Sequence, residues 1–167
     1  MRFLAAAALG LALLGLGACT PPMKEYAYPA WGFAAAFQSD PVVTDEPASA
    51  DGSRPHTLLV EASSGGRDFA VTATDASQAS NSPDEMLSQA PQLVAKSMGG
   101  TVDTTTYAAT GAVVGREVRI NKAGKPMMVL RVFVSNGRLY QVGAASVLGL
   151  GDPAVKTFLD SFRLTAK

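Results

Sequence analysis

Residues 125–145 carry the strongest structural signal in the chain. Two apolar runs, rich in β-branched and aromatic residues, flank the dipeptide Asn136-Gly137. This dipeptide favours a two-residue type I′ turn, because Asn and Gly tolerate the positive φ that both central positions require. Such a turn fixes the register, so that Ser135 faces Arg138. The segment therefore predicts a β-hairpin.

Both faces of this predicted hairpin are apolar, whereas a hairpin with one solvated face would show polar residues at alternate positions. One face carries Met128, Leu130, Val132, Val134 and Leu139. The other carries Met127, Val129, Phe133, Tyr140 and Val142, with Arg131 among them. We therefore expect the hairpin to lie in the middle of a sheet that is covered on both sides.

The rest of the chain predicts an α+β domain. Runs favouring strands occur at residues 31–37, 57–62, 68–74, 101–107 and 111–120. A capping box at residues 82–85 predicts a helix ending at Gly99-Gly100, with a kink or break at Pro91. A second helix is predicted after Asp152-Pro153. The Pro-rich residues 40–55 are predicted to form a loop.

Charge is distributed unevenly along the 167 residues, although the net charge is zero. Residues 20–110 have a net charge of −7, and residues 111–167 have a net charge of +6. A neutral chain argues against general nucleic-acid binding. The two halves can simply neutralise each other within one domain. Alternatively, basic residues form a surface for an acidic partner or an anionic membrane, and Arg116, Arg119 and Arg138 are the candidates for a partner surface.

The N-terminus predicts export. Met1-Arg2 precedes an apolar run over residues 3–16, which is too short for a comfortable transmembrane helix. Residues 16–19, Leu-Gly-Ala-Cys, resemble the lipobox of bacterial lipoproteins. The resemblance implies cleavage before Cys19, acylation of its thiol (palmitate is a typical chain), and anchoring in a membrane. The alternative is an ordinary signal peptide cut nearby, which leaves a stray thiol.

These features divide the chain into a signal peptide over residues 1–18, a lipidated tether over residues 19–30 and one domain over residues 31–167. The tether is expected because residues 20–30 contain three prolines and no hydrophobic period. Within the lipoprotein family, Thr20 is not the aspartate that retains proteins in the inner membrane. The resemblance therefore implies the periplasmic side of the outer membrane if the source is Gram-negative.

The order of predicted elements resembles the PsbP-like family. Three stretches carry the likeness: residues 33–41, 136–140 and 158–163. Gln38 departs from the pattern, because many relatives have proline there. The resemblance implies a central antiparallel sheet with helices on both faces, an α/β/α sandwich. It also implies a binding or assembly role rather than catalysis, since most members are non-enzymatic.

Catalytic chemistry finds little support in the sequence. The only histidine, His56, lies in a Pro-flanked stretch near Asp51 and Ser53, and we interpret it as a surface histidine rather than a general base. One histidine and one cysteine cannot complete a zinc site. We therefore expect no enzyme activity, no metal site and no cofactor.

The resulting hypothesis is a membrane-anchored envelope lipoprotein that binds or helps to assemble an envelope protein. The alternative is a periplasmic carrier of a small apolar ligand, held between helix and sheet.

Overall fold

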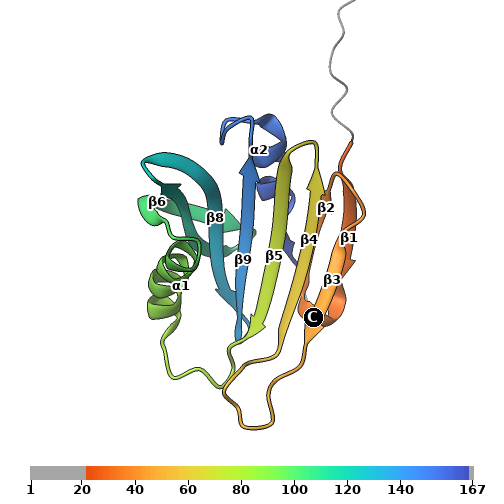
Figure 1. Cartoon of the computed structure of the whole chain (residues 1–167). Coiled ribbons are helices and arrows are strands. Elements are labelled where there is room, and N and C mark those ends of the chain that lie inside the picture. The colour runs from red at the N-terminus through yellow and green to blue at the C-terminus, as the bar shows by residue number, and fades with distance from the viewer. Residues whose placement is uncertain (1–21, 166–167) are drawn as a thin grey trace, which may run out of the picture.

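Seven antiparallel strands form the main sheet of the computed structural model, which describes residues 22–165, in the order β3-β4-β5-β9-β8-β7-β6 (Figure 1). Their bounds are β3 (Val42–Glu46), β4 (Thr57–Ser64), β5 (Arg67–Asp75), β6 (Thr101–Thr110), β7 (Val113–Lys122), β8 (Lys125–Ser135) and β9 (Arg138–Ser146). A smaller sheet contains β1 (Lys24–Tyr28), β2 (Phe33–Phe37) and β10 (Arg163–Leu164). The helices are α1 (Pro83–Ser97), α2 (Pro153–Ser161) and the short 3-10 helix η1 (Pro29–Trp31). The predicted α+β class is confirmed.

The predicted hairpin is confirmed as β8 and β9. Ser135 pairs with Arg138, and the φ angles are 51° at Asn136 and 69° at Gly137. Both central turn residues therefore have the positive φ of a type I′ turn. β8 and β9 lie in the interior of the main sheet, between β7 and β5.

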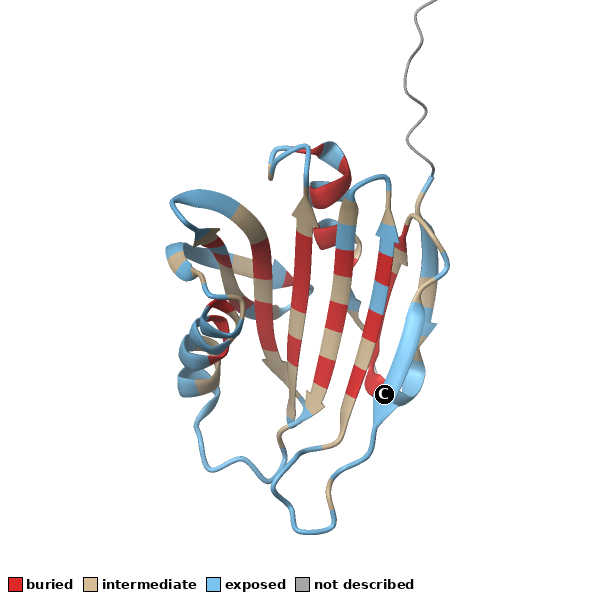
Figure 2. Ribbon diagram, in the orientation of Figure 1, coloured by how far each residue is buried: buried red, intermediate tan, exposed pale blue. Residues whose placement is uncertain are grey.

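Alternate residues of β8 enter two different hydrophobic cores. Val129 and Phe133 belong to the larger core, which also contains Phe158 of α2. Leu130 and Val132 belong to the smaller core, which α1 completes with Ala90 and Ala95. Side chains on a strand alternate between its two faces, so the two cores lie on opposite faces of β8. Figure 2 shows the same alternation of burial along β4 and β5.

The predicted tether over residues 19–30 is wrong for Lys24–Tyr28. These residues form β1, which pairs antiparallel with β2. The alternating tyrosines explain the pairing, because the ring of Tyr28 stacks on the ring of Phe33 at 4.8 Å. The folded domain therefore begins before residue 31.

Two further predictions differ from the structure. The predicted loop over residues 40–55 contains β3, whose short, exposed strand between two prolines gives little periodic signal. α1 continues through Pro91, which is buried in the helix, so the predicted break is not found. Packing of α1 on β6, β7 and β8 outweighs the local preference of proline.

Tyr140 connects the main sheet to the segment before β2. Its side chain is 2% exposed, and its hydroxyl donates a hydrogen bond of 2.9 Å to the carbonyl oxygen of Trp31. Burial raises the pKa of this hydroxyl, so it stays protonated and remains a donor at neutral pH.

Tyr140→Phe is expected to lower the free energy of unfolding by about 1–2 kcal/mol, because the buried carbonyl of Trp31 loses its donor. Urea denaturation of the two proteins measures the difference. Tyr107→Phe is the matched control, since Tyr107 is 87% exposed and should not change stability. Equal effects of the two substitutions would contradict the role assigned to Tyr140.

Candidate functional site

The predicted signal peptide and the predicted lipidation site, Cys19, lie outside the described residues. The first described residue, Pro22, lies three positions after Cys19. Pro22 lines a cavity of about 590 Å³ together with Leu148 and Asp152, at the start of α2. The described part of the chain therefore begins at this end of the domain.

The structure does not bring the three predicted partner residues onto one surface. Arg116 and Arg119 are three positions apart on β7, so their side chains leave opposite faces of the sheet. Arg138 begins β9, and its guanidinium lies 5.1 Å from the centre of the Trp31 ring. This cation–π contact gives Arg138 a local structural partner.

β6 is the longer of the two edge strands of the main sheet. It has ten residues, nearly all of them partly or fully exposed, and among the described strands it pairs with β7 alone. Its only charged side chain is that of Asp103, beside a bulge in the β6–β7 pairing. An edge of this length with few charges can accept a further strand.

The opposite edge, β3, is protected. It has only five residues and ends in Asp45 and Glu46, with a proline on each side. Short length, charge and proline all discourage pairing with another chain. The two edges of the sheet therefore differ in their capacity to accept a strand, and β6 is the candidate interface.

The turn between β6 and β7 decides which amides of β6 point outward. Thr110 faces Val113 across a two-residue turn, which makes them a hydrogen-bonded pair in an antiparallel ladder. Along β6 from Thr110, residues whose N–H groups point toward β7 alternate with residues whose N–H groups point toward the open edge. The backbone N–H groups of Thr105, Tyr107 and Ala109 therefore point toward the open edge.

Arg116 and Arg119 flank this edge from the two faces of the sheet. Arg116 faces Tyr107 in the β6–β7 register, and Arg119 faces Thr104. Neither arginine forms a salt bridge with another residue of the 22–165 range. Arg131 differs, because it contacts Glu117 at 2.7 Å. Positive charge is thus available on both sides of β6.

His56 has structural contacts that sequence analysis did not anticipate. Its Nε2 lies 2.6 Å from Oδ1 of Asp45, and its ring packs edge-on against Trp31. Asp51 does not contact it but accepts a hydrogen bond of 2.8 Å from Ser53. Hydrogen bonds from the serines of this loop lower the pKa of Asp51 to about 2. Asp51 and Ser53, which lie near His56 in the sequence, therefore bind each other.

A largely apolar cavity of about 440 Å³ lies beside His56. Met86 of α1, Leu139 of β9 and the loop after β5 contribute to its wall. It lies at the end of the domain that contains the β8–β9 turn, and most of its wall comes from the β3–β4 loop and the loop after β5. The sequence-based alternative expected an apolar ligand between helix and sheet, and of the helices only α1 reaches this cavity, through Met86.

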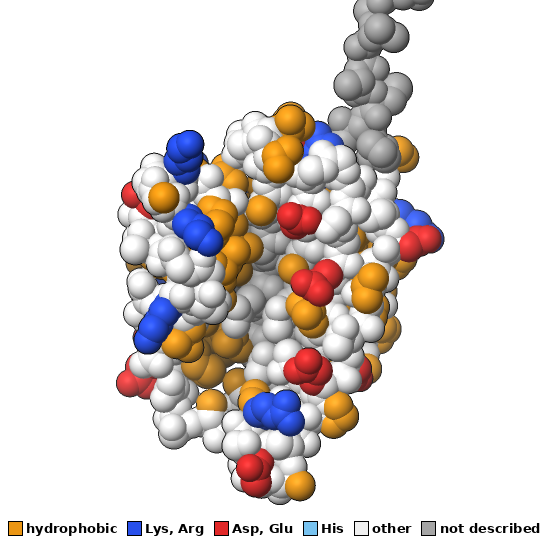
Figure 3. All heavy atoms as spheres, viewed as in Figure 1, with side chains coloured by type: hydrophobic (Ala, Val, Ile, Leu, Met, Phe, Trp, Pro, Cys, Tyr) orange, Lys and Arg blue, Asp and Glu red, His pale blue; other side chains and the backbone are white. Residues whose placement is uncertain are grey.

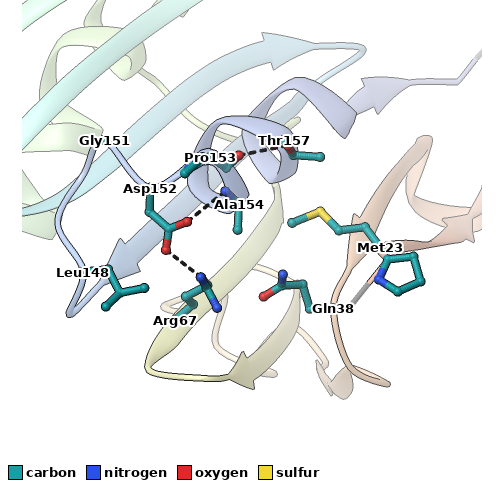
Figure 4. A pocket seen from close by; sticks show the side chains of 10 residues that line it. Met23, Gln38, Arg67, Leu148, Gly151, Asp152, Pro153, Ala154 and Thr157 are labelled. Carbon is teal, nitrogen blue, oxygen red and sulfur yellow. Dashed lines mark hydrogen bonds and ion pairs between the residues drawn. The ribbon is translucent and has the colours of Figure 1, made fainter. Parts of the chain in front are cut away.

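Polar side chains form one part of the wall of the cavity beside Pro22 (Figure 4). The Nε of Arg67 donates to Oδ2 of Asp152 at 2.6 Å, and Ser146 donates to the same oxygen at 2.9 Å. The hydrogen bond from Arg67 is the main reason that the pKa of Asp152 lies below its usual range. Both amide atoms of Gln38 are buried there without a partner among the described residues.

Two kinds of feature are absent from the described residues. No group of three or more His, Cys, Asp or Glu side chains within residues 22–165 has the arrangement of a metal site. No helix in that same part of the chain is long and apolar enough to cross a membrane.

Comparison with known proteins gives the fold. No family model matches the chain, and no curated protein matches it. Among solved structures, the chain is similar to the solution structure of cyanobacterial PsbP (CyanoP) from Synechocystis sp. PCC 6803. The TM-score is 0.56 at 11% sequence identity, and the match covers 95% of this chain and 98% of that chain. At this identity the likeness concerns architecture alone, and it shows that the chain has a PsbP-like fold.

Proposed function

We propose that this protein is a lipid-anchored, non-catalytic binding protein of the cell envelope that accepts an extended segment of an envelope protein along β6. The observation that carries the proposal is the long, weakly charged and exposed edge of the main sheet. The lipobox-like residues 16–19 support acylation of Cys19. In a Gram-negative cell, Thr20 after the cysteine favours the outer membrane, with the domain in the periplasm.

The proposal includes the α/β/α layering of the PsbP-like sandwich. Its support is the separation of the two cores, one containing α1 and the other α2, by the alternate side chains of β8. α1 packs on β6, β7 and β8, and α2 packs with β2 of the small sheet in the larger core. An edge of the sheet is then the natural place for a partner to bind.

Addition of a strand would use the outward amides of Thr105, Tyr107 and Ala109. Main-chain hydrogen bonds supply affinity in this mode, and side chains on the two faces supply selectivity. The incoming strand would lie about 10 Å from β7, two strand spacings away. Acidic side chains of the incoming strand would extend over β6 to meet Arg116 and Arg119. We therefore propose a partner segment with acidic residues on both of its faces.

Tyr107→Pro is expected to reduce capture of the partner at least about tenfold, because it removes one outward amide from the edge. The measurement is crosslinking in cells from a photoreactive residue at Ala109, followed by identification of the captured protein. The fold should survive, since Tyr107 is 87% exposed and proline is tolerated on edge strands. Tyr107→Thr is the matched control, because it removes the ring and keeps the amide.

Charge reversal tests whether the partner segment is acidic. Arg116→Glu with Arg119→Glu should weaken capture and remove its dependence on salt. Arg54→Glu is the control, because Arg54 is an exposed residue far from β6 in the β3–β4 loop. Capture that survives both Tyr107→Pro and the double charge reversal would exclude β6 as the interface.

The apolar cavity beside His56 favours a second candidate function, the transport of a small apolar ligand. Its volume of about 440 Å³ is within the range of small-molecule sites. Native mass spectrometry of the gently purified protein tests this function. A bound metabolite or lipid that is lost in Leu139→Arg would support it, whereas a mass equal to that of the acylated protein alone would contradict it.

A further inference from the structure

We infer that the end of the domain at which Pro22 lies is a membrane-docking surface, where Val147 and Leu148 enter the bilayer interface and Lys122 and Lys125 contact anionic headgroups. The inference rests on the proposed lipid anchor at Cys19. It adds a fixed orientation to that anchor, because a tether alone would let the domain rotate freely.

The connection between β9 and α2 presents two large apolar side chains to solvent. Val147 is 83% exposed and Leu148 is 67% exposed. Figure 3 shows hydrophobic side chains at the top of the molecule, over this connection. Together these two side chains form a small apolar patch at the tip of a loop, which a partner or a membrane can cover.

This loop is held in place by hydrogen bonds. The backbone N–H of Val147 donates to the carbonyl oxygen of Gly66 at 3.0 Å, which ties the loop to the β4–β5 turn. The backbone N–H of Leu148 donates to Oγ of Ser146 at 3.1 Å. The loop is therefore ordered in a conformation that exposes its apolar side chains, and little further ordering would oppose their insertion.

The position of Pro22, the first described residue, is the reason for choosing the bilayer as the occupant of this surface. Leu148 and Pro22 line the same cavity, and Cys19 is three residues before Pro22. Three residues span at most about 11 Å, so acyl chains on Cys19 would place the membrane next to Leu148. Figure 1 shows that β1 starts at the same end as the β9–α2 connection.

Charge at this end fits an anionic surface. Lys122 and Lys125 lie at the turn between β7 and β8, and they line a second cavity together with Val147. The nearby acidic residue, Asp68, accepts a hydrogen bond from Ser63. Neither lysine forms a salt bridge with the described residues. Both ammonium groups are therefore free to approach lipid phosphates beside the apolar tip.

The experiment uses the full acylated chain in vesicles of phosphatidylethanolamine and phosphatidylglycerol. A fluorophore attached through Leu148→Cys is expected to be quenched by brominated lipid at least about twofold more than one attached through Ala50→Cys. Ala50 is the matched control, since it is exposed in the β3–β4 loop at the opposite end of the domain (Figure 1). Equal quenching at the two positions would overturn the inference.

Two further measurements distinguish the lysine contacts, the lipid anchor and the orientation of the domain. Lys122→Glu with Lys125→Glu should abolish the extra quenching that phosphatidylglycerol gives over phosphatidylethanolamine alone, and an unchanged difference would exclude the lysines from the surface. Intact-mass measurement of the same preparation reports acylation directly. An unacylated Cys19 contradicts the proposed anchor, whereas an acylated chain with equal quenching contradicts only the orientation.

Discussion

Phe158→Ala is expected to lower the free energy of unfolding by about 3–5 kcal/mol. Phe158 of α2 is fully buried, and its ring centre lies 5.3 Å from that of Phe37 and 4.8 Å from that of Phe69. The three rings connect α2 to β2 of the small sheet and β5 of the main sheet. Truncation removes the shared contact and leaves a cavity that surrounding elements can fill only in part.

Urea denaturation of the mature domain measures this loss. Phe158→Leu should cost less, because leucine keeps most of the apolar volume. Leu93→Ala is the matched surface control, since Leu93 of α1 is 65% exposed. A Phe158→Ala protein that is destabilised no more than Leu93→Ala would show that α2 is not essential to the larger core.

The parts of the fold that were predicted correctly depend on neighbouring residues in the sequence. Asn136-Gly137 specifies its turn without help from the rest of the chain, and the hairpin is confirmed with the predicted register. Ser82 and Glu85 form the predicted capping box at the start of α1. In both cases the interaction that decides the structure spans four residues or fewer.

The parts that were missed depend on distant partners. β1 is held by its pairing with β2 and by contacts such as the stacking of Tyr28 on Phe33. Its own five residues, between prolines, have the composition of a linker. β3 is similar, since its only neighbour in the main sheet is β4. Short strands at the edge of a sheet give little periodic signal.

The candidate interface was predicted only in part for the same reason. The basic residues of β7 could be selected from the sequence, because charge is visible there. The spatial order of the strands could not, and this order makes β6 an edge and places Arg116 and Arg119 on either side of it. Arg138 was grouped with them by its charge and its place on the predicted hairpin, whereas the fold places it over Trp31.

Asp152→Ala is expected to cost about 3–5 kcal/mol of stability at neutral pH, because it leaves a buried charge without its partner. The side chain of Asp152 is 2% exposed, and that of its partner Arg67 is 14% exposed. Asp152 also accepts a hydrogen bond of 3.0 Å from the backbone N–H of Ala154, which caps the start of α2. One substitution therefore removes an ion pair and a helix cap together.

Asp152→Asn separates these two contributions, since asparagine keeps the capping oxygen but not the charge. The pH dependence gives an independent test. Arg67 lowers the pKa of Asp152 in the folded protein from its ordinary value of 3.8. Because the folded pKa lies below the unfolded one, the stabilisation is complete above the unfolded value and is lost as pH falls through the folded one. Urea denaturation at pH 7 and pH 3 should therefore show a smaller acid loss for Asp152→Asn than for the natural protein. Identical losses would mean that the pair with Arg67 does not contribute to stability, whatever its geometry.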